Sequence, residues 1–204
     1  MQYQPIEKNG GFHMIIGKIY KNNSGDEFVV LDKEARKSRM WVLIKFLATA
    51  STRWVIESNA SRGKVRDFYK RTRYGVGYLG ELDKKVPYYK QAKQLWANMM
   101  KRCYCDKDAK GYYKWGTEVA PRWHCLANFI EDLPHLENFD KWLAQKETGV
   151  NYNLDKDFLA PGCNVYSPDT CMFVDEHTNK SEGAKTTVDG YYRTVGSRPV
   201  AKVC

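Results

Sequence analysis

Short apolar runs separated by polar turn residues recur between residues 14 and 56. The runs follow one another at roughly ten-residue spacing and are rich in Val, Ile, Phe and Trp, as β-strands are. They cover residues 14–16, 28–31, 41–46 and 54–56. This pattern predicts a small twisted β-sheet or half-barrel, and the polar residues 1–11 before it predict a loose arm.

Residues 88–103 have the periodicity of an amphipathic helix. Tyr88, Trp96 and Met100 belong to a set of apolar side chains spaced three or four positions apart, and lysines occupy the opposite face. Two shorter helices are predicted near residues 122–132 and 136–146. The glycine-rich residues 74–80 form the connector between the sheet and these helices.

The last third of the chain predicts a strand, a turn, a second strand and a helix. The predicted strands are residues 151–159 and 163–166, and Thr170 introduces a short helix or turn over residues 171–179. The fold class is therefore α+β, with an N-terminal small β-sheet or half-barrel, central helices and a C-terminal strand–turn–strand–helix unit. The predicted divisions are an arm at 1–11, a β-rich domain at 12–80, a helical domain with the C-terminal unit at 81–182, and a tail with a possible β-hairpin at 183–204.

Charge is distributed unevenly along the chain. The 204 residues include 33 Lys and Arg against 24 Asp and Glu, a net charge of +9, and 43% of them are hydrophobic, enough to build a core. Residues 1–87 hold 17 of the basic and 9 of the acidic residues. The densest stretch contributes Arg62, Lys64, Arg66, Lys70, Arg71 and Arg73, interleaved with aromatic residues. Such cations attract backbone phosphates, so this stretch is predicted to bind DNA.

Membrane and secreted proteins are excluded on sequence grounds. The longest mostly apolar run, residues 40–50, is interrupted by Lys45, whereas a membrane span needs about 20 apolar residues. The first residues have neither the basic nor the apolar region of a secretory signal. The sequence therefore predicts a cytoplasmic protein with no membrane partner.

Three polar residues in the C-terminal unit suggest a metal-dependent nuclease site. Phosphodiester cleavage uses a hard cation such as Mg²⁺ or Mn²⁺ held by oxygen ligands, together with a base that activates water. Asp155 offers one oxygen ligand and Asn179 a second, with Asn164 between them.

The same residues carry a resemblance to a known family. The run Leu154-Asp155-Lys156-Asp157, the motif Asn164-x-Tyr166-Ser-Pro-x-x-Cys-x-Phe-Val and the later Asn179 resemble the HNH-type endonuclease domains encoded by bacteriophages, which are often free-standing homing endonucleases. The order of motifs from residue 74 to residue 179 is similar to that family as well. The resemblance implies a ββα-metal fold within residues 81–182 and Mg²⁺-dependent cleavage of double-stranded DNA.

The resemblance assigns roles to individual residues. Asp155 matches the aspartate that binds the metal, and Asn179 matches the helix ligand. Lys156 stands where the family has its histidine base; an ordinary lysine titrates near 10.4, so its expected role is to stabilise the charged transition state. Asp157 is expected to be a second ligand or the base. The structural asparagine of the motif maps to Asn164 or Tyr166.

Two departures from the family pattern leave alternative functions open. Lys156 replaces the histidine, and the chain ends about 25 residues after Asn179, with space for at most a hairpin. The alternatives are a DNA-binding protein that does not cleave, and an inhibitor of a host protein, each built on a degenerate HNH scaffold. In all three cases the expected location is the cytoplasm of an infected bacterial cell.

Overall fold

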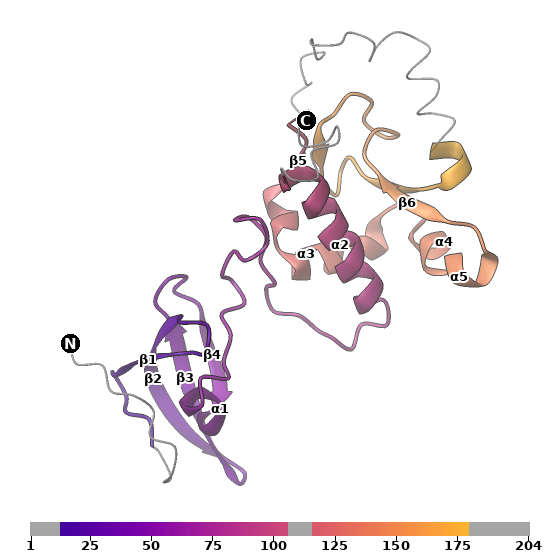
Figure 1. Ribbon diagram of the computed structural model, residues 1–204. Helices are drawn as coiled ribbons and strands as arrows, with labels where there is room; N and C mark the ends of the chain where they lie inside the picture. Colours follow the sequence, from indigo (N-terminus) through magenta and orange to yellow (C-terminus); the bar gives the residue numbers. More distant parts are fainter. Residues whose placement is uncertain (1–12, 106–115, 180–204) are drawn as a thin grey trace. The chain divides into compact units, whose positions relative to one another are not determined.

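The computed structural model describes residues 13–105 and 116–179, and the chain divides into two units, Met1–Lys70 and Arg71–Cys204 (Figure 1). Each unit is described by itself below. The predicted arm and the predicted tail hairpin lie outside the described residues.

The first unit contains an antiparallel sheet with the strand order β1-β2-β3-β4, followed by one short helix. The elements are β1 (Ile19–Lys21), β2 (Glu27–Arg36), β3 (Arg39–Phe46), β4 (Thr52–Ile56) and α1 (Glu57–Ser61). The predicted small sheet is confirmed in this form. The first predicted strand was wrong, because residues 14–16 are not a strand and the backbone N–H of Met14 donates instead to the Glu57 carboxylate at 2.7 Å.

Alternate residues of the strands form the core of the first unit. Phe28, Ile44 and Phe46 are fully buried and pack with Met14 and Val65, which come from outside the sheet. The opposite face carries half-buried side chains, including two tryptophans of β3 and β4. The sheet therefore buries one face, as is common for antiparallel sheets.

The second unit is built around α2 (Tyr89–Tyr104), which confirms the predicted helix to within one residue at each end. The other helical elements are η2 (Pro121–His124), α3 (Leu126–Asp132), η3 (Leu133–His135), α4 (Phe139–Leu143) and α5 (Gln145–Thr148). The predicted helix at 136–146 is divided, because Asn138 adopts a left-handed conformation (φ 61°) before α4 and Ala144 ends it. Trp123, Phe129 and Phe173 are fully buried at the centre of this unit.

The glycine-rich connector belongs to the second unit. Its backbone is paired with the start of α3: Leu126 N and Ala127 N donate to the carbonyls of Tyr78 and Leu79 at 2.9 and 3.0 Å. A side chain at Gly80 would bring a Cβ to 2.4 Å from the sulfur of Cys125, so the close approach requires glycine. These contacts place the division of the chain after Lys70, ten residues before the expected limit at residue 80.

Two short strand pairs complete the second unit. β5 (Glu118–Val119) pairs in parallel with β7 (Val165–Tyr166), and β6 (Tyr152–Asp155) pairs antiparallel with β8 (Met172–Asp175). Residues 176–179 are helical and follow β8 directly. The expectation of a helix or turn over residues 171–179 was therefore wrong for its first half, which is the strand β8. Of the two predicted strands, only the first lies in the pair that leads to the helix.

The hydrogen bonds of Thr170 explain why no helix begins at residue 171. Its hydroxyl accepts a hydrogen bond from Ser167 N at 3.0 Å and donates to the carbonyl of Val165 at 2.7 Å. It closes a turn and does not cap a helix. The next residues, Met172, Phe173 and Val174, are all buried and belong to β8. Within the described residues, no helix combines the length and the apolar character needed to cross a membrane.

Candidate functional site

Asp155 ends strand β6 and turns the chain out of the sheet. Its Oδ1 accepts hydrogen bonds from the backbone N–H groups of Asp157 and Phe158, both at 2.8 Å. Its Oδ2 takes part in none of the hydrogen bonds among the described residues. The carboxylate is half-buried, so it is fixed in orientation and presents one oxygen for a ligand.

Lys156 points into the second unit. Its side chain is only 6% exposed, and its ammonium lies 2.5 Å from Oδ1 of Asp157 and 6.0 Å from the ring centroid of Tyr166. Asp157, by contrast, is 47% exposed. Strand β6 ends at Asp155, so Asp157 lies in the turn that follows. In a continuous strand, residues two apart point to the same face, but this rule does not hold for a residue in a turn.

Two cysteines near this group remain protonated thiols. Burial raises the pKa of Cys103 and of Cys171 to about 12, although the positive charge of Lys156 acts in the opposite direction. A thiolate is the form that binds metals or attacks a substrate. Neither cysteine is therefore an activated nucleophile at neutral pH.

The residues expected to match the structural asparagine lie on or beside β7. Tyr166 is buried beneath Lys156, and Asn164 precedes the strand, where its carbonyl accepts a 2.8 Å hydrogen bond from Glu118 N. The described contacts thus bring Asp155, Lys156, Asp157 and Tyr166 into one cluster. Asn164 is joined to it through the β5–β7 pair.

Asn179 lies in the helical turn after β8. The register pairs Asp155 with Met172 and Tyr152 with Asp175, so the helix starts at the end of the ladder opposite to Asp155. Asp175 accepts a 2.9 Å hydrogen bond from Thr178 N, which stabilises the first turn. No hydrogen bond joins Asp155 to Asn179 in the part of the chain that the structure describes. Nor do residues 13–105 and 116–179 contain a group of three His, Cys, Asp or Glu side chains able to hold a metal.

The cations of the basic stretch lie at the surface of the protein. All six predicted residues, Arg62, Lys64, Arg66, Lys70, Arg71 and Arg73, are exposed. Residues 62–70, here called the cationic segment, belong to the first unit, and Arg71 and Arg73 belong to the second. Lys70 is ion-paired with Asp26, so its charge is already compensated.

Three anchors hold the cationic segment in place. The Gly63 carbonyl accepts from Asn23 N at 3.0 Å, and the Val65 carbonyl accepts from the Asn22 amide at 3.0 Å. The third anchor is the buried Asp67, whose carboxylate accepts from side chains of the β3–β4 turn. Because Val65 and Asp67 point inward, Lys64 and Arg66 are held on the outside.

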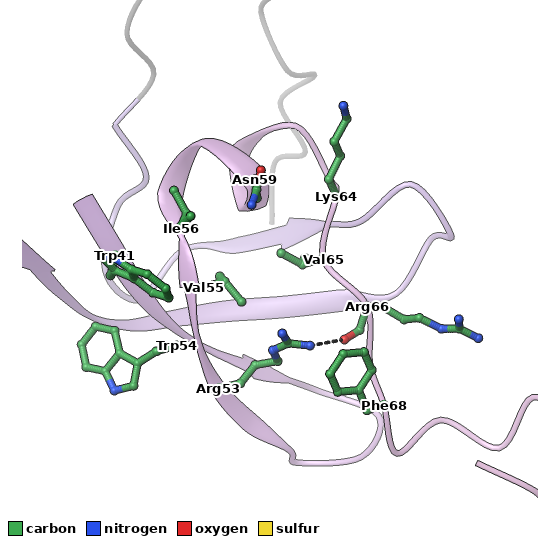
Figure 2. Close-up of a pocket in the computed structure, with 10 residues that line it drawn as sticks. All are labelled: Trp41, Arg53, Trp54, Val55, Ile56, Asn59, Lys64, Val65, Arg66 and Phe68. Atoms are coloured by element: carbon green, nitrogen blue, oxygen red, sulfur yellow. Dashed lines mark hydrogen bonds between the residues drawn. The ribbon is translucent and has the colours of Figure 1, made fainter. Parts of the chain in front are cut away.

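Beside this segment lies a hollow that the sequence reasoning missed. It is about 290 Å³ and runs along β4, between the tryptophans of the sheet and the cationic segment (Figure 2). Arg53 extends from β4 into it, packs 4.1 Å from the ring centroid of Phe68 and donates to the carbonyl of Arg66 at 3.3 Å. Trp41 and Trp54 alternate with buried Val42 and Val55 in their strands, which is the signal that could have identified them as facing out of the core.

Comparisons with protein-family models, with curated proteins and with solved structures find no match to this chain.

Proposed function

We propose that the protein is an HNH-type endonuclease of the bacteriophage kind, which binds duplex DNA and hydrolyses phosphodiester bonds with a divalent metal. The observation that carries the proposal is the order of elements around Asp155. An antiparallel pair, β6–β8, leads directly into a helix that starts at residue 176, with Asp155 at the end of the first strand and Asn179 in the helix. This is the strand–strand–helix order that the resemblance to HNH domains implies. The protein would act in the cytoplasm of an infected bacterial cell.

The donor chemistry suits Mg²⁺ or Mn²⁺. Asp155 would supply the Oδ2 carboxylate oxygen, a hard donor typical of magnesium sites that complete their shell with water and phosphate. Asn179, which the resemblance also assigns to the metal, follows the end of the β6–β8 ladder opposite to Asp155, so its amide oxygen would reach the same ion only if the helix folds back along the ladder. When bound, the metal would neutralise charge on the scissile phosphate. The chain's own contribution is orientation: the two N–H donors fix Asp155, and Lys156 fixes Asp157 beside it.

DNA binding is supported by the exposed cations. Arg62, Lys64 and Arg66 extend from an anchored backbone in the first unit, and Arg71 and Arg73 are exposed in the second. Cations on an anchored backbone lose little backbone freedom when they contact phosphates, which favours binding.

The buried position of Lys156 favours a second candidate. A family member with a lysine at this position, paired inward with Asp157, lacks the imidazole base. The alternative is accordingly a DNA-binding protein that does not cleave, or a protein that binds and inhibits a host protein, on a degenerate HNH scaffold.

Nicking of supercoiled plasmid separates the two candidates. The purified protein is incubated with Mg²⁺ or Mn²⁺, with an EDTA control, beside Asp155→Ala and a matched acid variant in the nearby turn, Asp169→Ala. The endonuclease requires metal-dependent nicking that Asp155→Ala loses and Asp169→Ala retains. Intact plasmid that still shifts on a gel would overturn the cleavage proposal and favour the binding protein.

A further inference from the structure

The hollow along β4 combines aromatic and cationic side chains in the first unit. Trp41 of β3 and Trp54 of β4 lie on the face of the sheet turned away from the core. Arg53, the neighbour of Trp54 in the edge strand β4, extends on the other side of that strand and packs on Phe68 (Figure 2). The backbone of residues 64–68 forms the other side. Nothing in this arrangement is used by the candidate site around Asp155, which belongs to the second unit.

The aromatic rings are fixed by arginine contacts. The guanidinium of Arg36 lies 4.5 Å from the ring centroid of Trp54 and 5.4 Å from that of Trp41. Arg53 is similarly packed on Phe68. Rings and guanidinium groups held in this way are the surfaces on which nucleic-acid bases stack, and the stacking is tolerant of sequence.

Charge favours a polyanion as the occupant. Residues 1–70 include thirteen Lys and Arg against seven Asp and Glu. The ion pairs Asp26–Lys70 and Glu57–Lys33 each cancel one charge of either sign, so they leave the excess of six positive charges unchanged. Lys64 and Arg66 at the rim are exposed. An acidic chain with planar groups fits this surface better than a neutral peptide does.

The size of the hollow limits what enters it. Its volume of about 290 Å³ lies at the lower end of the roughly 300–1,000 Å³ of complete small-ligand sites. It can take one unit of a polymer whose other contacts lie outside. A base within a continuous duplex is stacked on both sides and cannot enter.

We propose that this hollow binds a single unpaired nucleotide of the DNA at the open edge of β4, with its base against Trp54 and its phosphate against Arg53. The proposal rests on the proposed function, since it deepens how the protein recognises DNA. It makes the first unit a reader of an extruded or unpaired base, in addition to a phosphate-binding surface.

The test compares three short fluorescein-labelled duplexes in EDTA at fixed ionic strength: one intact, one with a single bulged thymine, and one with an abasic residue at the bulge. Fluorescence anisotropy measures binding by the full chain. The wild-type protein should bind the bulged thymine about tenfold more tightly than the abasic bulge, which is the typical effect of one stacked base. Trp54→Ala should remove that difference, and Trp54→Phe should restore part of it.

Tyr69→Ala is the matched control, because Tyr69 is an exposed aromatic residue of the cationic segment that does not line the hollow. It should leave the tenfold difference intact. Equal binding of the thymine and abasic bulges by the wild-type protein would overturn the proposal without any variant, and so would an equal effect of Tyr69→Ala and Trp54→Ala. If equal binding accompanies metal-dependent nicking, the hollow proposal fails alone; if no duplex binds, DNA recognition by this chain fails as well.

Discussion

Asp67 accepts a 2.7 Å hydrogen bond from the hydroxyl of Thr49, although it lies in the middle of the most basic stretch of the chain. It also accepts from the Ser51 hydroxyl at 3.1 Å and from Tyr69 N at 2.9 Å. The carboxylate therefore ties the cationic segment to the turn between β3 and β4. An acid that would weaken DNA binding by its charge instead holds the cations in place.

Asp67→Ala should weaken DNA binding although it makes the protein more positive. Loss of the carboxylate removes three hydrogen bonds, from half-buried Thr49 and Ser51 and from Tyr69 N, which costs about 1–3 kcal/mol of unfolding free energy. It also releases the segment that holds Lys64 and Arg66. Glu27→Ala makes the same change of charge at a half-exposed residue that anchors nothing in the segment. The affinity for DNA, measured by fluorescence anisotropy, should fall in Asp67→Ala and stay equal or rise in Glu27→Ala. Tighter binding by both variants would show that net charge alone determines the affinity.

Two glycines of the first unit have similar backbone angles and different surroundings. Gly63 (φ +67°) would place a Cβ 2.3 Å from the Asn23 side-chain oxygen and 2.9 Å from its backbone nitrogen, whereas Gly25 (φ +81°) has open space. Gly25→Ala should therefore cost only the left-handed strain, on the order of 1 kcal/mol. Gly63→Ala should cost that and more, because the anchor to Asn23 must shift. Urea unfolding of the two variants measures the difference in unfolding free energy. Equal losses of stability would show that the contact between Gly63 and Asn23 relaxes without cost.

The carboxylate of Glu57 makes the stability of the first unit depend on pH. Burial alone raises the pKa of this carboxyl, but hydrogen bonds from Lys33 and from Met14 N outweigh burial and lower the pKa below its ordinary value of 4.5. A group with a lowered pKa stabilises the fold above its unfolded-state value, and this stability is lost as the pH falls through the folded-state value. Glu57→Gln should be less stable than wild type at pH 6, by about 1–3 kcal/mol.

The two proteins should converge in stability at an acidic pH below the lowered folded-state pKa, where the wild-type carboxyl becomes protonated. Urea unfolding followed by tryptophan fluorescence at both pH values provides the comparison. An unchanged gap at low pH would mean that packing, and not the charge, accounts for the effect of the substitution.

The phosphate contacts can be counted from the salt dependence of binding. Each cation that displaces a counterion contributes about 0.9 to the slope of log K against log salt concentration. Arg66→Gln should reduce the slope by about that amount, because Arg66 is exposed. Lys70→Gln should reduce it less, since Lys70 is ion-paired with Asp26. Equal reductions of the slope by the two substitutions would show that DNA displaces the Asp26 carboxylate from Lys70.

The sequence predicted those helices and strands whose residue spacing or composition is distinctive within a single segment. The spacing of Trp96 and Met100 predicts α2, and the β-rich run from Trp41 to Phe46, bounded by turn residues, predicts β3. Strand β8 was not predicted, because Phe173 and its two neighbours are all buried. The run therefore lacks the alternation of apolar and polar residues that would distinguish a strand from a helix.

In the candidate site too, features that depend on contacts between distant segments were not predicted. The sequence predicts Asp155 in the middle of a strand over residues 151–159, whereas the strand ends at Asp155. The inward direction of Lys156 depends on β7, which supplies Tyr166. The hollow was not predicted because Arg53 and Phe68 meet only through the fold. Contacts between residues far apart in the chain leave no periodic signal in either segment.

The pair formed by Lys156 and Asp157 is asymmetric in burial, and this predicts an asymmetric response to mutation. The lysine side chain is 6% exposed and the aspartate 47%. Removing the carboxylate in Asp157→Ala leaves a buried ammonium without its ion-pair partner, which should cost about 1–3 kcal/mol of unfolding free energy. Lys156→Met replaces the ammonium with an apolar chain of similar length and leaves only a solvated carboxylate, so the cost should be under about 1 kcal/mol.

The double variant, Lys156→Met with Asp157→Ala, should be more stable than Asp157→Ala alone, because it no longer buries an unpaired charge. Urea unfolding of the four proteins closes a double-mutant cycle and gives the coupling energy of the pair. Plasmid nicking by the same four proteins then assigns the role of Lys156. If its charge acts only by holding Asp157, nicking by Lys156→Met should fall no further than nicking by Asp157→Ala. A much larger loss in Lys156→Met would show that the ammonium itself acts on the phosphate.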